Sequence, residues 1–220
     1  MPTRRTKDES TRPEFSESVV PLPPVSGIYD IIVQVANFHA PVGGLDTPLE
    51  LGELSSLRKY EQTKGSLAVF IASVLLMLAF FQFLLYSFQR EERHYLYFGL
   101  MYLCMMIYTI GLNSTYWSGI IPFLTWGTVY SAMAIAVYLW GALAIGFLQR
   151  LFPLDVPGRV VPLVFAVNGA LAVVMAALPA RWLAYLLLVL HINSLFIIGL
   201  CVYISFRAAL NRREFAIYAV

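Results

Sequence analysis

The sequence predicts an all-α transmembrane helical bundle, preceded by a short extracellular β segment. Of its 220 residues, 59% are hydrophobic and only 13% are charged, and the mean hydropathy is +0.71. A soluble domain usually carries about 25% charged residues. The apolar residues also cluster, because between Leu67 and Phe88 the sequence is interrupted only by Ser73, Gln82 and Ser87. About 20 apolar residues span a bilayer as a helix, and lipid offers no partner for the edges of an open sheet.

The part of the chain before the first apolar run divides into two. Residues 1–26 are charged and lack periodic apolar residues, so we expect them to be disordered. Residues 27–65 are expected to form a partial β segment and a connector. The stretch IYDIIVQV is rich in β-branched residues, and Gly43-Gly44 is a turn signal. Two short strands are marginal alone, so this segment is predicted to belong to a larger β-domain, and residues 53–65 to be a polar connector or helical lead-in.

Residues 66–220 are predicted to form a multi-helix transmembrane domain. Spans are expected at about 67–88, 95–112, 123–148, 160–178 and 182–206, with the start of a sixth at 215–220. Six residues cannot cross a bilayer. We therefore expect the chain to be an incomplete copy of a longer protein.

The charges of the loops predict the orientation. Arginines lie in the first, third and fifth loops, namely Arg90, Arg93, Arg150, Arg159, Arg207, Arg212 and Arg213. The second loop has none and the fourth has Arg181 alone. Positively charged loops stay in the cytoplasm, so the N-terminal segment is predicted outside a cell (inner) membrane. Arg58, Lys59 and Lys64 oppose this orientation, but the rule weakens when a folded domain is translocated first.

No catalytic constellation is visible, and we expect neither an enzyme nor a metal, cofactor or nucleic-acid site. Every Asp, Glu, Lys and Arg between Leu67 and Phe206 lies in a loop, and no phosphate-binding loop, dinucleotide fingerprint or zinc spacing occurs. A lipid-modifying enzyme would need acidic or histidine side chains near the interface. The residues that qualify are Glu91, Glu92, His94 and Asp155.

Four polar residues are candidates for ligand binding. Asn168, His191 and Asn193 lie inside predicted spans, where they are either a ligand or switching contact or an inter-helix hydrogen bond that fixes packing. His39 follows the predicted strand and is either a ligand contact or a solvated loop residue.

The order of the segments resembles a known family. YDIIVQVANFH is followed by a double glycine, a short stretch ending in Leu51-Gly52, and then Lys64-Gly65 with a helix ending in FFQFLLYSF. A tight charged loop precedes a Tyr-rich second helix, REERHYLYFGLMYLCMMIYTIG. This order is similar to that of the bacterial seven-transmembrane receptors with diverse intracellular signalling modules (7TMR-DISM). The resemblance covers roughly residues 27–220 and is most specific up to the second span.

The resemblance implies a fold, partners and a function. In that family an extracellular β-sandwich similar to carbohydrate-binding jelly rolls leads into seven helices and a histidine kinase or nucleotide cyclase. The β segment would be a remnant of that sandwich, with Asn37, Gly43, Gly44 and Gly52 as structural residues of its closing strands. The implied partners are membrane lipid, a small-molecule or carbohydrate-like ligand and the cytoplasmic module, and a homodimer is left open. Most of the sandwich, the seventh helix and the output module are missing from this sequence.

Two functions follow as expectations. The first is a membrane sensory receptor segment in bacterial signal transduction, which relays an extracellular or intramembrane ligand signal to a cytoplasmic module. The alternative is a small multi-pass transporter or membrane-complex subunit, which inverted repeats with broken helices would support. The sequence shows no clear internal repeat.

Overall fold

A computed structural model of the chain describes residues 21–22, 50–113, 126–178 and 180–211. Within these ranges the regular elements are five long helices: α1 (Leu54–Phe88), α2 (His94–Leu112), α4 (Trp126–Leu151), α5 (Val160–Ala177) and α6 (Ala180–Leu210). Each is long and apolar enough to cross a membrane. The predicted all-α bundle is thereby confirmed, and the chain is a multi-pass membrane protein.

Several expectations fall outside the described residues. These expectations concern nearly all of residues 1–26, expected to be disordered, the β segment as far as residue 49, the second loop, and the start of a sixth span at 215–220. Residues 50–53, which are described, lead into α1 without regular secondary structure.

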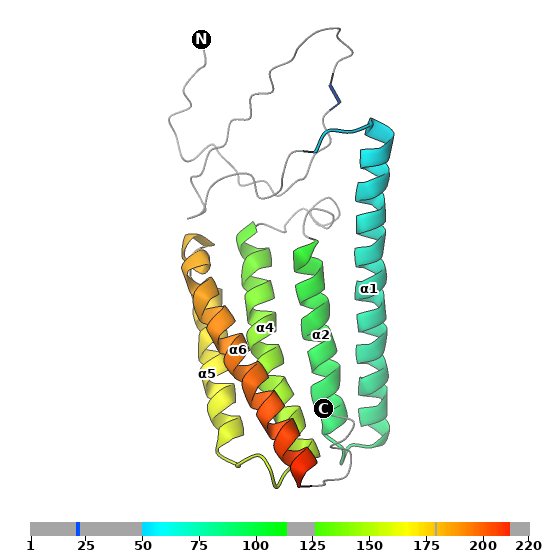
Figure 1. Cartoon of the computed structure of the whole chain (residues 1–220). Helices are drawn as coiled ribbons and strands as arrows, with labels where there is room; N and C mark the ends of the chain where they lie inside the picture. Colours follow the sequence, from blue (N-terminus) through cyan, green and yellow to red (C-terminus); the bar gives the residue numbers. More distant parts are fainter. Residues whose placement is uncertain (1–20, 23–49, 114–125, 179, 212–220) are drawn as a thin grey trace.

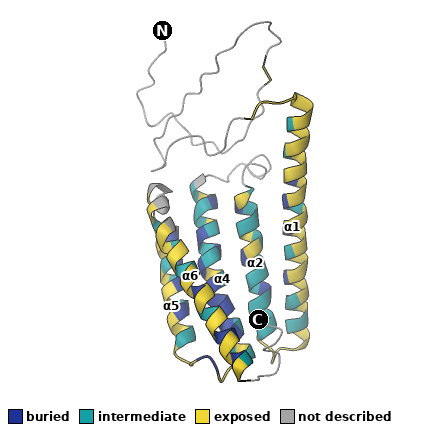
Figure 2. Ribbon diagram, viewed as in Figure 1, coloured by how far each residue is buried: buried dark blue, intermediate teal, exposed yellow. Residues whose placement is uncertain are grey.

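Successive helices run in opposite directions, and α4 lies in the middle (Figure 1). It packs against α2 on one side and against α5 and α6 on the other, whereas α1 packs chiefly against α2. More than half of the membrane-crossing stretch of α4 is buried, against less than a quarter for each of the other helices. Figure 2 shows the same contrast, with burial concentrated on α4 and exposed residues along α1 and α6.

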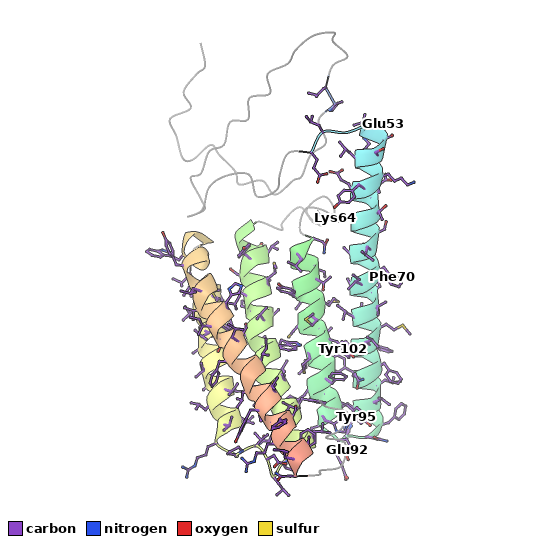
Figure 3. The ribbon with its side chains drawn as sticks, in the orientation of Figure 1. Glu53, Lys64, Phe70, Glu92, Tyr95 and Tyr102 are labelled. Carbon is purple, nitrogen blue, oxygen red and sulfur yellow. The ribbon has the colours of Figure 1, made fainter. Side chains whose placement is uncertain are left out.

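α1 is much longer than a bilayer requires. Its 35 residues rise about 1.5 Å each, so the helix is about 52 Å long, against a hydrocarbon core of about 30 Å. It begins after Glu53, whose carbonyl accepts hydrogen bonds from the backbone N–H groups of Ser56 and Leu57, both at 3.0 Å. Figure 3 shows Lys64 about level with the ends of the neighbouring helices and Glu53 far beyond them. Residues 54–63, called the stalk below, therefore continue the membrane helix outside the bundle.

Small residues form the contact between α1 and α2. The buried residues of α1 are Gly65, Ala68, Ala72 and Ala79, whereas large side chains such as Phe70, which is 66% exposed, face away. Gly99 of α2 completes this contact, because a Cβ there would lie 2.8 Å from Cε1 of Phe83. The two helices are joined by a tight turn in which the Glu92 N–H donates to the Gln89 carbonyl at 3.0 Å.

Two other glycines let α2 and α4 approach closely. A Cβ at Gly111 would overlap Cγ of Met133, and a Cβ at Gly146 would lie 2.7 Å from Cε1 of Tyr97. Where helices meet in lipid, such close approach replaces the hydrophobic driving force that water supplies elsewhere. α2 and α4 are therefore fixed in register by interlocking side chains.

The connections α1–α2 and α4–α5 and the end of α6 lie at the same end of the bundle (Figure 1). We call it the arginine-rich end, because it carries Arg90, Arg93, Arg150, Arg159 and Arg207. The stalk lies at the opposite end (Figure 1).

Candidate functional site

Asn168 is a buried polar residue in the middle of α5. It is only 1% exposed, and its Nδ2 donates to the Val164 carbonyl one turn earlier at 2.9 Å. This local bond is a common way for a short polar side chain to be held in a helix. It leaves Oδ1 as the group that the amide offers to a neighbouring helix.

Asn193 of α6 meets that oxygen. Its Nδ2 donates to Asn168 Oδ1 at 2.9 Å, a good hydrogen-bond length. Measured contacts of this kind between membrane helices contribute about 0.6 kcal/mol on average and up to about 1.7 kcal/mol. The structure thus brings together two of the residues that the sequence singled out, and it joins α5 to α6 through them.

Gly141 of α4 lies beside this pair. A Cβ at Gly141 would lie 3.7 Å from Asn168 Oδ1 and 3.4 Å from Cγ2 of Ile197, which is itself 2% exposed. Three helices therefore meet at the paired amides, in apolar surroundings. This geometry suits a packing contact that can be broken and remade when a helix shifts.

The other predicted candidates are not part of this pair. His191 lies two residues before Asn193 and is exposed, so the two side chains do not share a face of α6. His39, Asn37, Gly43 and Gly44 lie outside the described residues. A Cβ at Gly52 would make only an ordinary contact, 3.5 Å from Cγ of Leu57.

Sequence reasoning missed the partners of Asp155. This residue lies in the α4–α5 connection and its side chain is 2% exposed. Its Oδ1 accepts a hydrogen bond from Asn211 Nδ2 at 2.7 Å and lies 3.8 Å from Nε of Arg207. The sequence placed Asp155 near the interface, but its partners lie more than 50 residues later, and only the fold brings them together.

α1 contributes an unusual polar group. Oε1 of Gln82 is buried and has no hydrogen-bond partner among the described residues. Cβ of Gln82 lies where α1 meets Gly99 of α2, 3.2 Å from the position of a Cβ at that glycine. A buried acceptor without a donor costs about 1–3 kcal/mol, so the α1–α2 contact is not at its most stable.

Reactive side chains are sparse among the residues that the structure describes. Cys104 is buried and Cys201 half-buried, both as free thiols within helices. Among the described residues no three His, Cys, Asp or Glu side chains lie close enough to hold a metal ion. The polar groups at hand are suited to forming and breaking hydrogen bonds between helices.

A family model described as 7TM diverse intracellular signalling matches residues 65–220. No curated protein and no solved structure matches the chain.

Proposed function

Because the chain belongs to the family of 7TM diverse intracellular signalling proteins, we propose that it is the membrane segment of a sensory receptor. It relays a signal from an outer ligand, or from a ligand within the bundle, to a cytoplasmic output module such as a histidine kinase or nucleotide cyclase. It acts by binding and movement and performs no catalysis itself. The observation that carries this proposal is the continuity of α1 from the stalk through the membrane.

A continuous helix can carry a displacement along its length. Rotation or translation of the stalk must appear at the other end of α1, because the backbone hydrogen bonds run without interruption from Leu54 to Phe88. α1 packs chiefly against α2, where Phe83 fits against Gly99. α2 in turn interlocks with α4 at Gly111 and Gly146. We infer that a displacement of α1 reaches α2 and, through α2, the rest of the bundle.

In this proposal the signal runs towards the arginine-rich end. We propose that the arginine-rich end is cytoplasmic and the stalk outside an inner membrane, because arginine-rich loops are retained in the cytoplasm. Membrane-impermeant thiol labelling in whole cells tests this in a variant lacking Cys104 and Cys201. Cysteine at exposed Arg58 should react, and cysteine at Leu154, which is 73% exposed, should react only after the cells are opened. The reverse pattern would overturn the orientation.

The ligand is proposed only by class. A small molecule or a carbohydrate-like molecule bound outside the membrane would act through the stalk. One bound within the bundle would act at the Asn168–Asn193 pair, where three helices meet. Both routes end in a shift between two helix packings, which is the usual form of such switches.

Insertions in the stalk test the relay. One to four alanines inserted after Thr63 turn the outer part of the stalk by about 100° per residue relative to the membrane helix. In the intact protein with its output module, basal phosphorylation or cyclic-nucleotide synthesis should vary with a period of about 3.6 inserted residues. Matched insertions of glycine should abolish the periodicity by breaking the helix. An output independent of alanine number, or solute uptake into vesicles by the purified protein, would refute the receptor function.

A further inference from the structure

The α4–α5 connection, residues 152–159, is folded against α6. Phe152 and Val156 are each 2% exposed and belong to one core cluster with Ile204 and Ala208 of α6. The connection also makes its own turn, in which the Val156 N–H donates to the Phe152 carbonyl at 3.3 Å. It is thus a fixed support on which the end of α6 rests.

Asp155 adds a polar attachment to this support. Its buried Oδ1 accepts from Asn211 Nδ2 at 2.7 Å and lies 3.8 Å from Arg207 Nε. Arg207 and Asn211 are four residues apart, so both lie on the same side of α6. A buried carboxylate is costly without such partners, which makes the attachment specific to one position of α6.

The attachment is also one that can open. The distance of 3.8 Å between Arg207 Nε and Asp155 Oδ1 exceeds hydrogen-bond length. The Arg207 guanidinium therefore does not make the tight bidentate ion pair that arginine can form with a carboxylate. Arg207 is 47% exposed and Asn211 lies at the exposed end of the helix. A small displacement of α6 would let water reach all three side chains and replace the lost contacts.

Polar contacts hold α6 at two points along its length. Asn193 binds Asn168 within the bundle, and Arg207 is 14 residues further along, which corresponds to about 21 Å of helix. Its outward side chains, such as Phe206 and Leu210, are exposed. When the attachment at Asp155 is open, apolar contacts with Phe152 and Val156 still hold this end of α6, and a tilt of the helix about Asn193 would shift them.

We propose that Asp155, Arg207 and Asn211 form a latch that holds the arginine-rich end of α6 in one signalling state and opens in the other. The proposal rests on the receptor function inferred above, because a latch regulates only a protein that switches. Asp155 acts as a positioning residue: it sets the position of the end of α6 at Arg207 and Asn211.

Distances between spin labels test the latch in the full chain, reconstituted in lipid nanodiscs without Cys104 and Cys201. One pair, at the exposed residues Leu154 and Leu210, spans the latch. The control pair, at exposed Val173 and Leu195, reports on α5 and α6 away from it.

We expect Asp155→Ala, which removes the contacts with both Asn211 and Arg207, to lengthen the latch distance by about 1–2 Å, a typical helix shift in a switching protein. Arg207→Gln, which leaves the Asn211 hydrogen bond in place, should lengthen it less, and the control distance should not change in either variant. The double variant should shift no further than Asp155→Ala, because Asp155→Ala already removes the contact with Arg207. Arg150→Gln, which removes an exposed arginine at the end of α4, should leave both distances as they are.

The outcomes separate the latch from the receptor function. An unchanged latch distance in Asp155→Ala would overturn the latch and leave the receptor function standing. A change of both distances together would also overturn it, because Asp155 would then support the whole bundle. If the latch opens as expected but the output of the intact protein does not change, its regulatory role is refuted. A changed output together with a changed latch distance alone supports the proposal.

Discussion

Replacing Asn193 by leucine should destabilise the bundle through the oxygen that it leaves behind. Asn168 is 1% exposed, and its Nδ2 is already bound to the Val164 carbonyl. Without Asn193 Nδ2, Oδ1 of Asn168 loses its donor at 2.9 Å and stays buried among apolar atoms. An acceptor in this position costs about 1–3 kcal/mol. Replacing both asparagines by leucine removes donor and acceptor together, and should cost less than Asn193→Leu alone.

A double-mutant cycle measures this coupling directly. We expect an interaction free energy of about 0.6–2 kcal/mol between Asn168→Leu and Asn193→Leu, from equilibrium unfolding in mixed detergent micelles. Asn113 supplies the matched control, because its Nδ2 donates to the Thr109 carbonyl within its own helix at 2.9 Å. Asn113→Leu should therefore add to Asn168→Leu without coupling. If the Asn168 and Asn193 substitutions were additive within about 0.3 kcal/mol, the hydrogen bond would not be what joins α5 to α6.

Three further predictions concern packing and exposure. Gly111→Ala should lower the free energy of unfolding by about 1–3 kcal/mol, because the added methyl would overlap Met133. Gly199→Ala, which meets nothing within 4 Å, should change it by less than about 0.5 kcal/mol, and equal effects would contradict the close α2–α4 contact. Gln82→Leu should raise thermal stability, since it removes a buried acceptor without a partner; a clear loss would show that Oε1 has a donor. A nitroxide at Phe70 should be relaxed by oxygen dissolved in lipid, and preferential relaxation by a water-soluble nickel reagent would place this part of α1 outside the membrane.

The membrane helices could be predicted because length and apolarity decide them. A run of about 20 apolar residues has few alternatives in a bilayer. The start of α1 was harder to place, because hydropathy marks where lipid begins and says little about where a helix begins. Several residues after Glu53, among them Arg58, Lys59 and Glu61, are good helix formers, so the helix runs ahead of the apolar stretch by more than three turns.

The contacts between helices could not be predicted from the sequence. It identified Asn168 and Asn193 as polar groups within spans, but their meeting depends on how α5 and α6 rotate about their own axes. Packing around Gly141 and Ile197 sets that rotation. The partners of Asp155 depend on the same packing, because the α4–α5 connection must first fold onto α6.

The tight turn between α1 and α2 has a consequence for biogenesis. The membrane-crossing stretch of α1 is the most apolar of the five, and α2 has 19 residues, barely enough to cross the hydrocarbon core. A translocon tests each emerging segment for its transfer free energy into lipid, and α2 alone gains little by entering. The turn at Gln89 and Glu92 holds α2 beside α1. α2 therefore enters the membrane with Gly99 already covered by Phe83 of α1. The two helices are thus suited to insertion as a hairpin, against which the later helices assemble.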